Sequence, residues 1–136
     1  MAHEKFPVEV LTPEGEIFND EVEMVSTRTT VGSIGILANH APLLAMLDPT
    51  ELRLYKTESE VVRFAQAEGY LQVADNHALI LVEEAIAPGD LDTGRIRERL
   101  QQAEHELDSA GEDTEKRRVA ERDKTRLEQF LKIAEG

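Results

Sequence analysis

The chain has 136 residues, enough for one ordinary domain or for a small domain with an appendage. Its 28 acidic and 15 basic residues give a formal net charge of −13, which argues against nucleic-acid binding and disfavours adsorption on anionic lipid. It contains no cysteine, which excludes disulfides and thiolate chemistry. The first ten residues lack the apolar core of a signal peptide, and no run approaches the roughly 18 apolar residues of a membrane span. We expect no direct membrane insertion, so membrane association comes through partners.

Residues 6–88 have the pattern of an all-β domain. Short apolar or alternating runs are separated by turn signals, such as Thr12-Pro13-Glu14-Gly15 and Asp75-Asn76. Strands spaced about eight to twelve residues apart are typical of a β-sandwich or barrel. The runs that indicate strands cover residues 6–11, 16–18, 22–26, 52–55, 61–65, 70–73 and 78–82. The fold class predicted for residues 1–88 is therefore an antiparallel β-sandwich.

Residues 32–47, with the sequence GSIGILANHAPLLAML, form the most distinctive stretch. Two apolar runs flank Asn39-His40-Ala41-Pro42, and Pro42 lacks the N–H that a ladder needs. The pattern predicts a folded-back β unit with Asn39 and His40 at its tip. His40 either holds this corner by a hydrogen bond to a neighbouring carbonyl or lies at a protein contact, and the sequence leaves both interpretations open.

The composition changes at Pro88-Gly89-Asp90, after which Arg, Glu, Gln and Leu dominate. Asp90 or Asp92 can cap a helix whose apolar residues are spaced 4, 3, 4 and 3 apart, at Ile96, Leu100, Ala103, Leu107 and Ala110. A polar break follows, and a second helix is predicted from Thr114 or Glu115. Residues 89–136 should therefore form an antiparallel two-helix hairpin. Its apolar seam is thin, so we expect a mobile element.

Charge is divided unevenly between these parts. Residues 1–88 carry 5 basic and 15 acidic residues, a net charge of −10, whereas residues 89–136 carry 10 and 13, a net charge of −3. The acidic residues Glu14, Glu16, Glu21 and Glu23 are most simply solvated strand positions that discourage edge pairing.

Catalytic signatures are missing from the sequence. The four histidines show no metal spacing, and HExxH, GxSxG and Walker motifs do not occur. We therefore expect no catalytic residues and no required cofactor or metal.

The hairpin carries one candidate ligand site. Asp92 and Arg95 share a helix face, as do Arg122 and Arg126, and the ends of an antiparallel hairpin could bring all four together around a phosphate chain. Ordinary charge pairs along each helix explain the same residues equally simply.

Four stretches carry a resemblance to a known family: residues 13–18 (PEGEIF), residues 32–44 (GSIGILANHAPLL), residues 51–53 (ELR) and residues 90–92 (DLD). Together they resemble the epsilon subunit of the bacterial F-type ATP synthase, over essentially the whole chain. The resemblance implies a β-sandwich followed by a helical hairpin. It also implies a non-catalytic central-stalk subunit, peripheral on the cytoplasmic face of the bacterial cell membrane. Its partners would be the gamma subunit, the proton-driven c-subunit ring, and the alpha and beta subunits.

The same resemblance assigns roles to individual residues. Ser33, Asn39 and His40 would lie near the polar loops of the c ring, although many relatives have an acidic residue at the position of Ser33. The hairpin of the family can extend into the catalytic head and oppose ATP hydrolysis, and Arg117, Arg118, Lys124 and Lys132 would then contact acidic segments of that head. Some relatives bind regulatory ATP through motifs that Asp92, Arg95, Arg122 and Arg126 match, with Ile96 in place of an alanine. The alternative function is therefore an ATP-sensing module whose hairpin closes on nucleotide.

Overall fold

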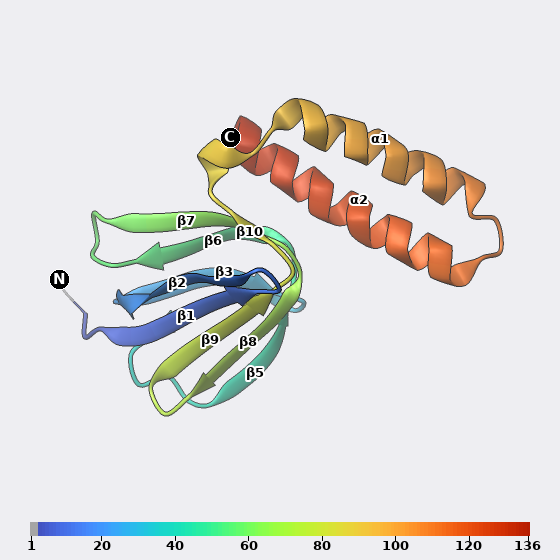
Figure 1. The fold of residues 1–136 in the computed structure, drawn as a ribbon. Coiled ribbons are helices and arrows are strands. Elements are labelled where there is room, and N and C mark those ends of the chain that lie inside the picture. The colour runs from blue at the N-terminus through green and yellow to red at the C-terminus, as the bar shows by residue number, and fades with distance from the viewer. Residues whose placement is uncertain (1–2) are drawn as a thin grey trace. The chain divides into compact units, whose positions relative to one another are not determined.

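The computed structural model describes residues 3–136. The chain divides into two compact units at the Ala87–Pro88 bond (Figure 1). The sequence pattern had indicated a boundary one residue later. Ten strands make up the first unit, and a short 3₁₀ turn with two helices makes up the second. The prediction of a β-sandwich followed by a helical hairpin is confirmed.

The strands are short and closely spaced, because turn residues recur along residues 6–86. Their bounds are β1 (Phe6–Thr12), β2 (Gly15–Val22), β3 (Met24–Thr29), β4 (Gly32–Leu37), β5 (Leu43–Leu47), β6 (Thr50–Tyr55), β7 (Val61–Gln66), β8 (Gly69–Ala74), β9 (His77–Val82) and β10 (Ala85–Ile86). Positive φ angles at Gly15, Gly32, Asp75 and Asn76 close three of the tight turns.

One continuous hydrogen-bonded path joins the strands in the order β10-β7-β6-β3-β5-β8-β9-β1-β2, with β4 attached to β3. The pairing of β1 with β9 is parallel, and the other strand pairs within residues 3–136 are antiparallel. The sheet curls into two layers (Figure 1), which places one set of alternating side chains between them.

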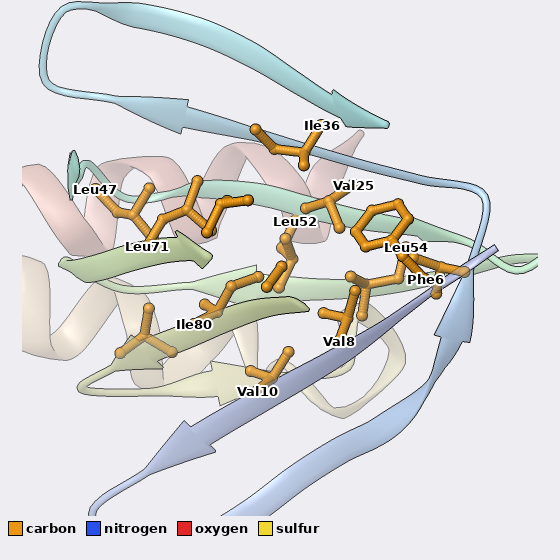
Figure 2. Packing of buried hydrophobic residues seen from close by; sticks show 14 residues of the cluster. Phe6, Val8, Val10, Val25, Ile36, Leu47, Leu52, Leu54, Leu71 and Ile80 are labelled. Carbon is orange, nitrogen blue, oxygen red and sulfur yellow. The ribbon is translucent and has the colours of Figure 1, made fainter. Parts of the chain in front are cut away.

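The core lies between these layers and consists mainly of aliphatic side chains. Figure 2 shows side chains from β1, β3, β4, β5, β6, β8 and β9 pointing toward one another. Phe6, Val8, Val10, Leu52 and Ile80 are at most 1 % exposed. One polar pair accompanies them, since the Thr27 hydroxyl donates to Gln66 Oε1 at 2.6 Å and Gln66 Nε2 donates to the Asp48 carbonyl at 2.8 Å.

The prediction of a folded-back unit over residues 32–47 is wrong. β4 pairs with β3 along its whole length, from Met24↔Leu37 to Thr29↔Gly32. β5 meets β3 only at Thr29↔Leu47, on the other edge, and pairs with β8 along its own length. The positive φ of 63° at Asn39 turns the chain out of β4, so the two apolar runs join different neighbours.

The helical unit begins with a 3₁₀ turn (Pro88–Asp90), followed by α1 (Thr93–Ser109) and α2 (Thr114–Glu135). Asp92 caps α1 by accepting from the Arg95 N–H at 3.1 Å, because the 3₁₀ turn occupies Asp90, the other candidate cap. Asp113 caps α2 in the same way through the Lys116 N–H at 3.0 Å. Among residues 3–136, no helix has the length and apolar character needed to cross a membrane.

Candidate docking surface

The outer face of β5, β8, β9 and β1 carries a row of apolar side chains. The strand registers place Met46 opposite Tyr70, Tyr70 opposite Leu81, and Leu81 opposite Leu11. Met46, Tyr70 and Leu81 are 56 %, 51 % and 42 % exposed. Directly opposed residues on one face of a sheet contact each other, so these four form one continuous apolar surface, called the apolar row below.

Leu44, two residues before Met46 on β5, lies on the same face, and its exposed side chain extends this surface along the strand. A hollow of about 420 Å³ beside it is lined by Pro42, Leu43, Leu44, Gln72, Val73 and Ala74. A second hollow, of about 300 Å³, lies at the end of the apolar row where β8 begins and β9 ends. Exposed apolar patches of this kind mark interaction sites on folded proteins.

Sequence reasoning missed the apolar row, although a signal for it was present. A sandwich strand with one solvated face should alternate apolar and polar residues, but residues 43–47 (LLAML) and 78–82 (ALILV) are apolar at every position. Their inward side chains, such as Leu47 and Ile80, enter the core, whereas the outward side chains of Leu44, Met46 and Leu81 are exposed.

The Asn39–His40 corner is held by hydrogen bonds to distant parts of the sandwich. The Asn39 N–H donates to Asn76 Oδ1 at 2.6 Å, and Asn39 Nδ2 donates to Glu4 Oε2 at 3.0 Å. His40 Nδ1–H donates to the Ala41 carbonyl at 2.7 Å. The geometry matches the first interpretation of His40, in which its ring holds the corner through a neighbouring carbonyl.

The structure does not place Ser33 at this corner. Ser33 lies opposite Arg28 at the other end of β4, next to the β3–β4 turn that Thr29 closes by donating to the Gly32 carbonyl at 2.9 Å. At about 3.3 Å per residue, Ser33 is about 13 Å along β4 from Leu37, after which the chain turns toward Asn39 and His40. Val31, at the tip of the turn beside Ser33, is 94 % exposed. The three residues expected at one corner therefore belong to two separate ends of the sandwich.

Three of the four acidic strand residues, Glu14, Glu16 and Glu21, are exposed as expected. The expectation is wrong for Glu23, which is 6 % exposed. Glu23 stands in the short break between β2 and β3, where its N–H donates to the Tyr55 carbonyl at 2.7 Å and holds the residue beside the end of β6.

Asp20 is a further acidic residue of the sandwich surface, and its ion pair with Lys56 joins two segments that are distant in sequence. The Lys56 ammonium lies 3.0 Å from Asp20 Oδ2 and 3.4 Å from Glu60 Oε2. Its hydrogen bond to Asp20 and its positive charge lower the pKa of that carboxyl, and the same contacts raise the pKa of Lys56. This exposed cluster links β2 to the turn between β6 and β7.

The hairpin does not bring Asp92, Arg95, Arg122 and Arg126 together. The ion pair between Arg97 and Glu135, at 2.9 Å, sets the start of α1 beside the last turn of α2. Arg126 and Arg122 lie about 13 Å and 20 Å back along α2 from Glu135, at 1.5 Å per residue. The antiparallel start and end do meet as expected, but the two arginines are not at that end because α2 continues to Glu135.

The basic residues predicted to contact a catalytic head lie along α2. Arg118 bonds Glu115 through Nη2 at 2.6 Å, which lowers the pKa of the Glu115 carboxyl and raises that of Arg118. Arg117 Nη2 donates to the Gly111 carbonyl at 2.8 Å, and the side chain of Lys132 is exposed, whereas Lys124 is half-buried. Within residues 3–136, no three His, Asp or Glu side chains are grouped as metal ligands would be.

Comparison with known proteins identifies relatives over most of the chain. Residues 5–88 match the family model described as the ATP synthase delta/epsilon chain, beta-sandwich domain. The chain is similar to the ATP synthase epsilon chain of Priestia megaterium, at 40 % identity over 107 residues that cover 78 % of each chain. It is also similar to the ATP synthase epsilon chain of Persephonella marina, at 38 % identity over 103 residues that cover 76 % of each.

A longer match reaches into the helical unit. The ATP synthase epsilon chain of Sulfurihydrogenibium sp. is 30 % identical over 129 residues, which cover 95 % of this chain and 96 % of the relative. Among solved structures, a chain of the Euglena gracilis mitochondrial ATP synthase OSCP/F1/c-ring assembly has the same fold, with a TM-score of 0.81 at 21 % identity. That match covers 97 % of this chain and 82 % of the other.

Proposed function

The chain belongs to the family of ATP synthase epsilon chains, and we propose that it acts as a non-catalytic subunit of the central stalk that couples rotation of a c ring to ATP synthesis. Family membership supports the place in the complex. The apolar row supports docking on this particular face, because its side chains expose to water an apolar area that a protein interface would cover. The partner on this face is the gamma subunit.

A triple variant tests the docking face. Replacing Met46, Tyr70 and Leu81 with serine should leave the fold intact, since all three side chains point outward, yet abolish co-purification with gamma and proton-driven ATP synthesis in reconstituted vesicles. Arg63→Ser, an exposed change on β7, is the matched control and should leave both activities in place. Full synthesis and gamma binding by the triple variant would exclude this face.

The two ends of β4 are not equivalent candidates for contact with the c ring. At the Asn39–His40 end the polar groups already bond to Glu4, Asn76 and Ala41. At the Ser33 end, Val31 projects into solvent. We therefore assign the ring contact to the Ser33 end and a supporting role to Asn39 and His40.

Cross-linking separates the two ends cleanly, because the chain has no cysteine of its own. Ser33→Cys, paired with single cysteines in the polar loop of the c subunit, should form a disulfide within the assembled complex. His40→Cys is the matched probe at the other end and should cross-link less. The reverse ranking would move the ring contact to the Asn39–His40 corner.

We further propose that the hairpin restrains ATP hydrolysis through contacts with the alpha and beta subunits. Its compactness as a separate unit and the basic side chains along α2 support this role. Ending the chain after Ala87 should raise ATP hydrolysis by the complex while leaving synthesis largely intact. Replacing Arg117, Arg118, Lys124 and Lys132 with alanine should give part of that increase, and unchanged hydrolysis in both variants would remove the regulatory role.

The location follows from the proposed assembly. A subunit that contacts gamma and the c ring is a peripheral protein of the bacterial cell membrane, held on its cytoplasmic face by the complex. Cell fractionation of strains with and without the gamma subunit tests this, since the chain should leave the membrane fraction when gamma is absent.

Regulatory ATP remains a prediction, and it is the second candidate function. The matching residue types on both helices support it, whereas the hairpin geometry described above keeps Arg122 and Arg126 away from Asp92 and Arg95. A nucleotide site using all four would need a different arrangement of the two helices.

A further inference from the structure

β4 is an edge strand of the sandwich. It pairs with β3 on one side, and within residues 3–136 it pairs with no second strand. The backbone N–H and C=O groups of successive residues point alternately to the two sides of a strand, so about half of those in β4 point away from β3. Among the described residues, no backbone hydrogen bond joins residues 33–37 to an element other than β3. The outward groups are therefore available to a further strand.

The sequence of β4 does not protect this edge. Exposed edges are usually blunted by charged side chains, by proline or by a very short strand. β2, at one end of the hydrogen-bonded path, carries Glu16, Asp20 and Glu21, and β10, at the other end, has only two residues. β4 has six residues, GSIGIL, with neither charge nor proline. An edge of this kind is suited to pairing with a strand from another chain.

The side chains of β4 indicate what kind of segment fits beside it. Ile36 is fully buried, and Ile34 packs against the core. Ser33, Gly35 and Leu37 are exposed on the opposite face of the strand. A neighbouring strand continues both faces of its sheet, so its inward side chains would lie beside Ile34 and Ile36, and its outward ones would face water. The fitting partner is therefore an extended segment in which apolar and polar residues alternate.

The free edge begins next to the apolar row. The Thr30 N–H donates to the Met46 carbonyl at 3.0 Å, so the β3–β4 turn is bonded to the strand that carries the first residue of that row. β4 starts two residues later, at Gly32, and Val31 between them is exposed. A partner that covers Met46 thus lies beside the start of the free edge, and one chain can occupy both surfaces.

We propose that an extended segment of the gamma subunit adds to the sandwich as a further strand beside residues 34–37 of β4. This pairing rests on the docking of gamma proposed above and adds main-chain hydrogen bonds to the apolar contact. Such bonds supply affinity, and the alternation of side chains along β4 sets the register. The Ser33 end, which precedes the paired residues, stays free for the c-ring contact assigned above.

Amide hydrogen exchange tests the pairing directly, with the full-length chain alone and bound to gamma. In the free chain the outward amides of β4 should exchange fast, because only water bonds to them. With gamma at about 100 times its dissociation constant, their exchange should slow by up to about 100-fold, since it then requires release of the segment. The outward amides of β2, on the charged edge, are the internal control and should exchange at the same rate in both samples.

A lysine variant tests the same edge through affinity. A Cβ at Gly35 would lie 3.8 Å from Met24 Sδ, an ordinary contact, so Gly35→Lys should fold with a melting temperature near that of the unaltered chain. The added charge should oppose strand addition and raise the dissociation constant for gamma about tenfold, the loss expected from one or two hydrogen bonds. Asn19→Lys makes the same change of charge on β2 and should bind gamma like the unaltered chain.

Three results would overturn the pairing. Gamma that binds without slowing the β4 amides, or that binds Gly35→Lys as tightly as Asn19→Lys, would leave the docking face in place and exclude strand addition. Slowing that depends on the concentration of the chain alone would identify a second copy of the chain as the occupant. If gamma neither binds nor slows any amide, the docking of gamma itself is wrong.

Discussion

The two units of this chain are stabilised by different kinds of interaction. In the sandwich, buried side chains from eight strands form one mainly aliphatic cluster whose members are far apart in sequence. In the hairpin three of the six buried apolar side chains are alanines, at positions 103, 110 and 120, beside Ile96, Leu127 and Phe130. The apolar area buried per residue is therefore smaller, and local capping interactions take a larger share of the stability. We therefore expect a small loss of contacts to affect the stability of the hairpin more than that of the sandwich.

The largest expected effect sharpens the contrast between the inner and outer faces of the sandwich. Leu52→Ala removes a fully buried side chain and should lower the free energy of unfolding by about 2–5 kcal/mol. Leu44→Ala deletes the same atoms from a position that is 73 % exposed and should change it by less than about 0.5 kcal/mol. Urea unfolding of both variants checks this, and equal effects would mean that Leu44 is covered in the free protein.

A cap variant tests how strongly the hairpin depends on local interactions. Asp113→Ala removes the acceptor for the Lys116 N–H and should destabilise α2 by about 1 kcal/mol. Amide exchange should accelerate throughout residues 114–135 and stay unchanged in the sandwich. Glu128→Ala, an exposed change in the middle of α2, should leave exchange near its original rate. Faster exchange in β-strand amides would show that the two units unfold together.

A smaller effect concerns the pH dependence of the sandwich surface. The folded-state pKa of Asp20 is lowered by Lys56, so this pair stabilises the fold above the ordinary Asp pKa of about 4 and loses that contribution as the pH falls through the folded value. Lys56→Gln should raise the pKa of Asp20 toward its ordinary range in an NMR titration. Arg63→Gln, an exposed change on β7, is the control and should leave the pKa of Asp20 lowered, because Arg63 is not one of the charges that lower it.

The smallest expected effect is the heat of nucleotide binding. With the helices arranged as observed, titration of the full chain with millimolar ATP should produce no more heat than titration of Arg122→Ala, since the four candidate residues are not gathered. Saturable heat that disappears in Arg122→Ala would contradict this expectation. It would show that the hairpin adopts a second arrangement and would favour the sensor function.

Local patterns in the sequence determined the division of the chain and most of its elements. Turn residues such as Asp75-Asn76 mark the β8–β9 hairpin, Asp92 marks the start of α1, and the polar break before Thr114 marks the start of α2. Turns and caps can be predicted in this way because they depend on a few neighbouring residues. The apolar spacing of residues 96–110 likewise identified the buried side of α1, with Ile96, Ala103 and Ala110 covered.

Tertiary structure decided which surfaces and clusters those elements form. Alternation tells which residues share a face of a strand, but not which edge pairs with which neighbour. Only the fold therefore separates Ser33 from His40, buries Glu23 and aligns Met46, Tyr70 and Leu81. Helix spacing similarly gives the faces of α1 and α2 but not their relative register. The contact of Arg97 with Glu135 shows this register, which keeps the two pairs of candidate ligands apart.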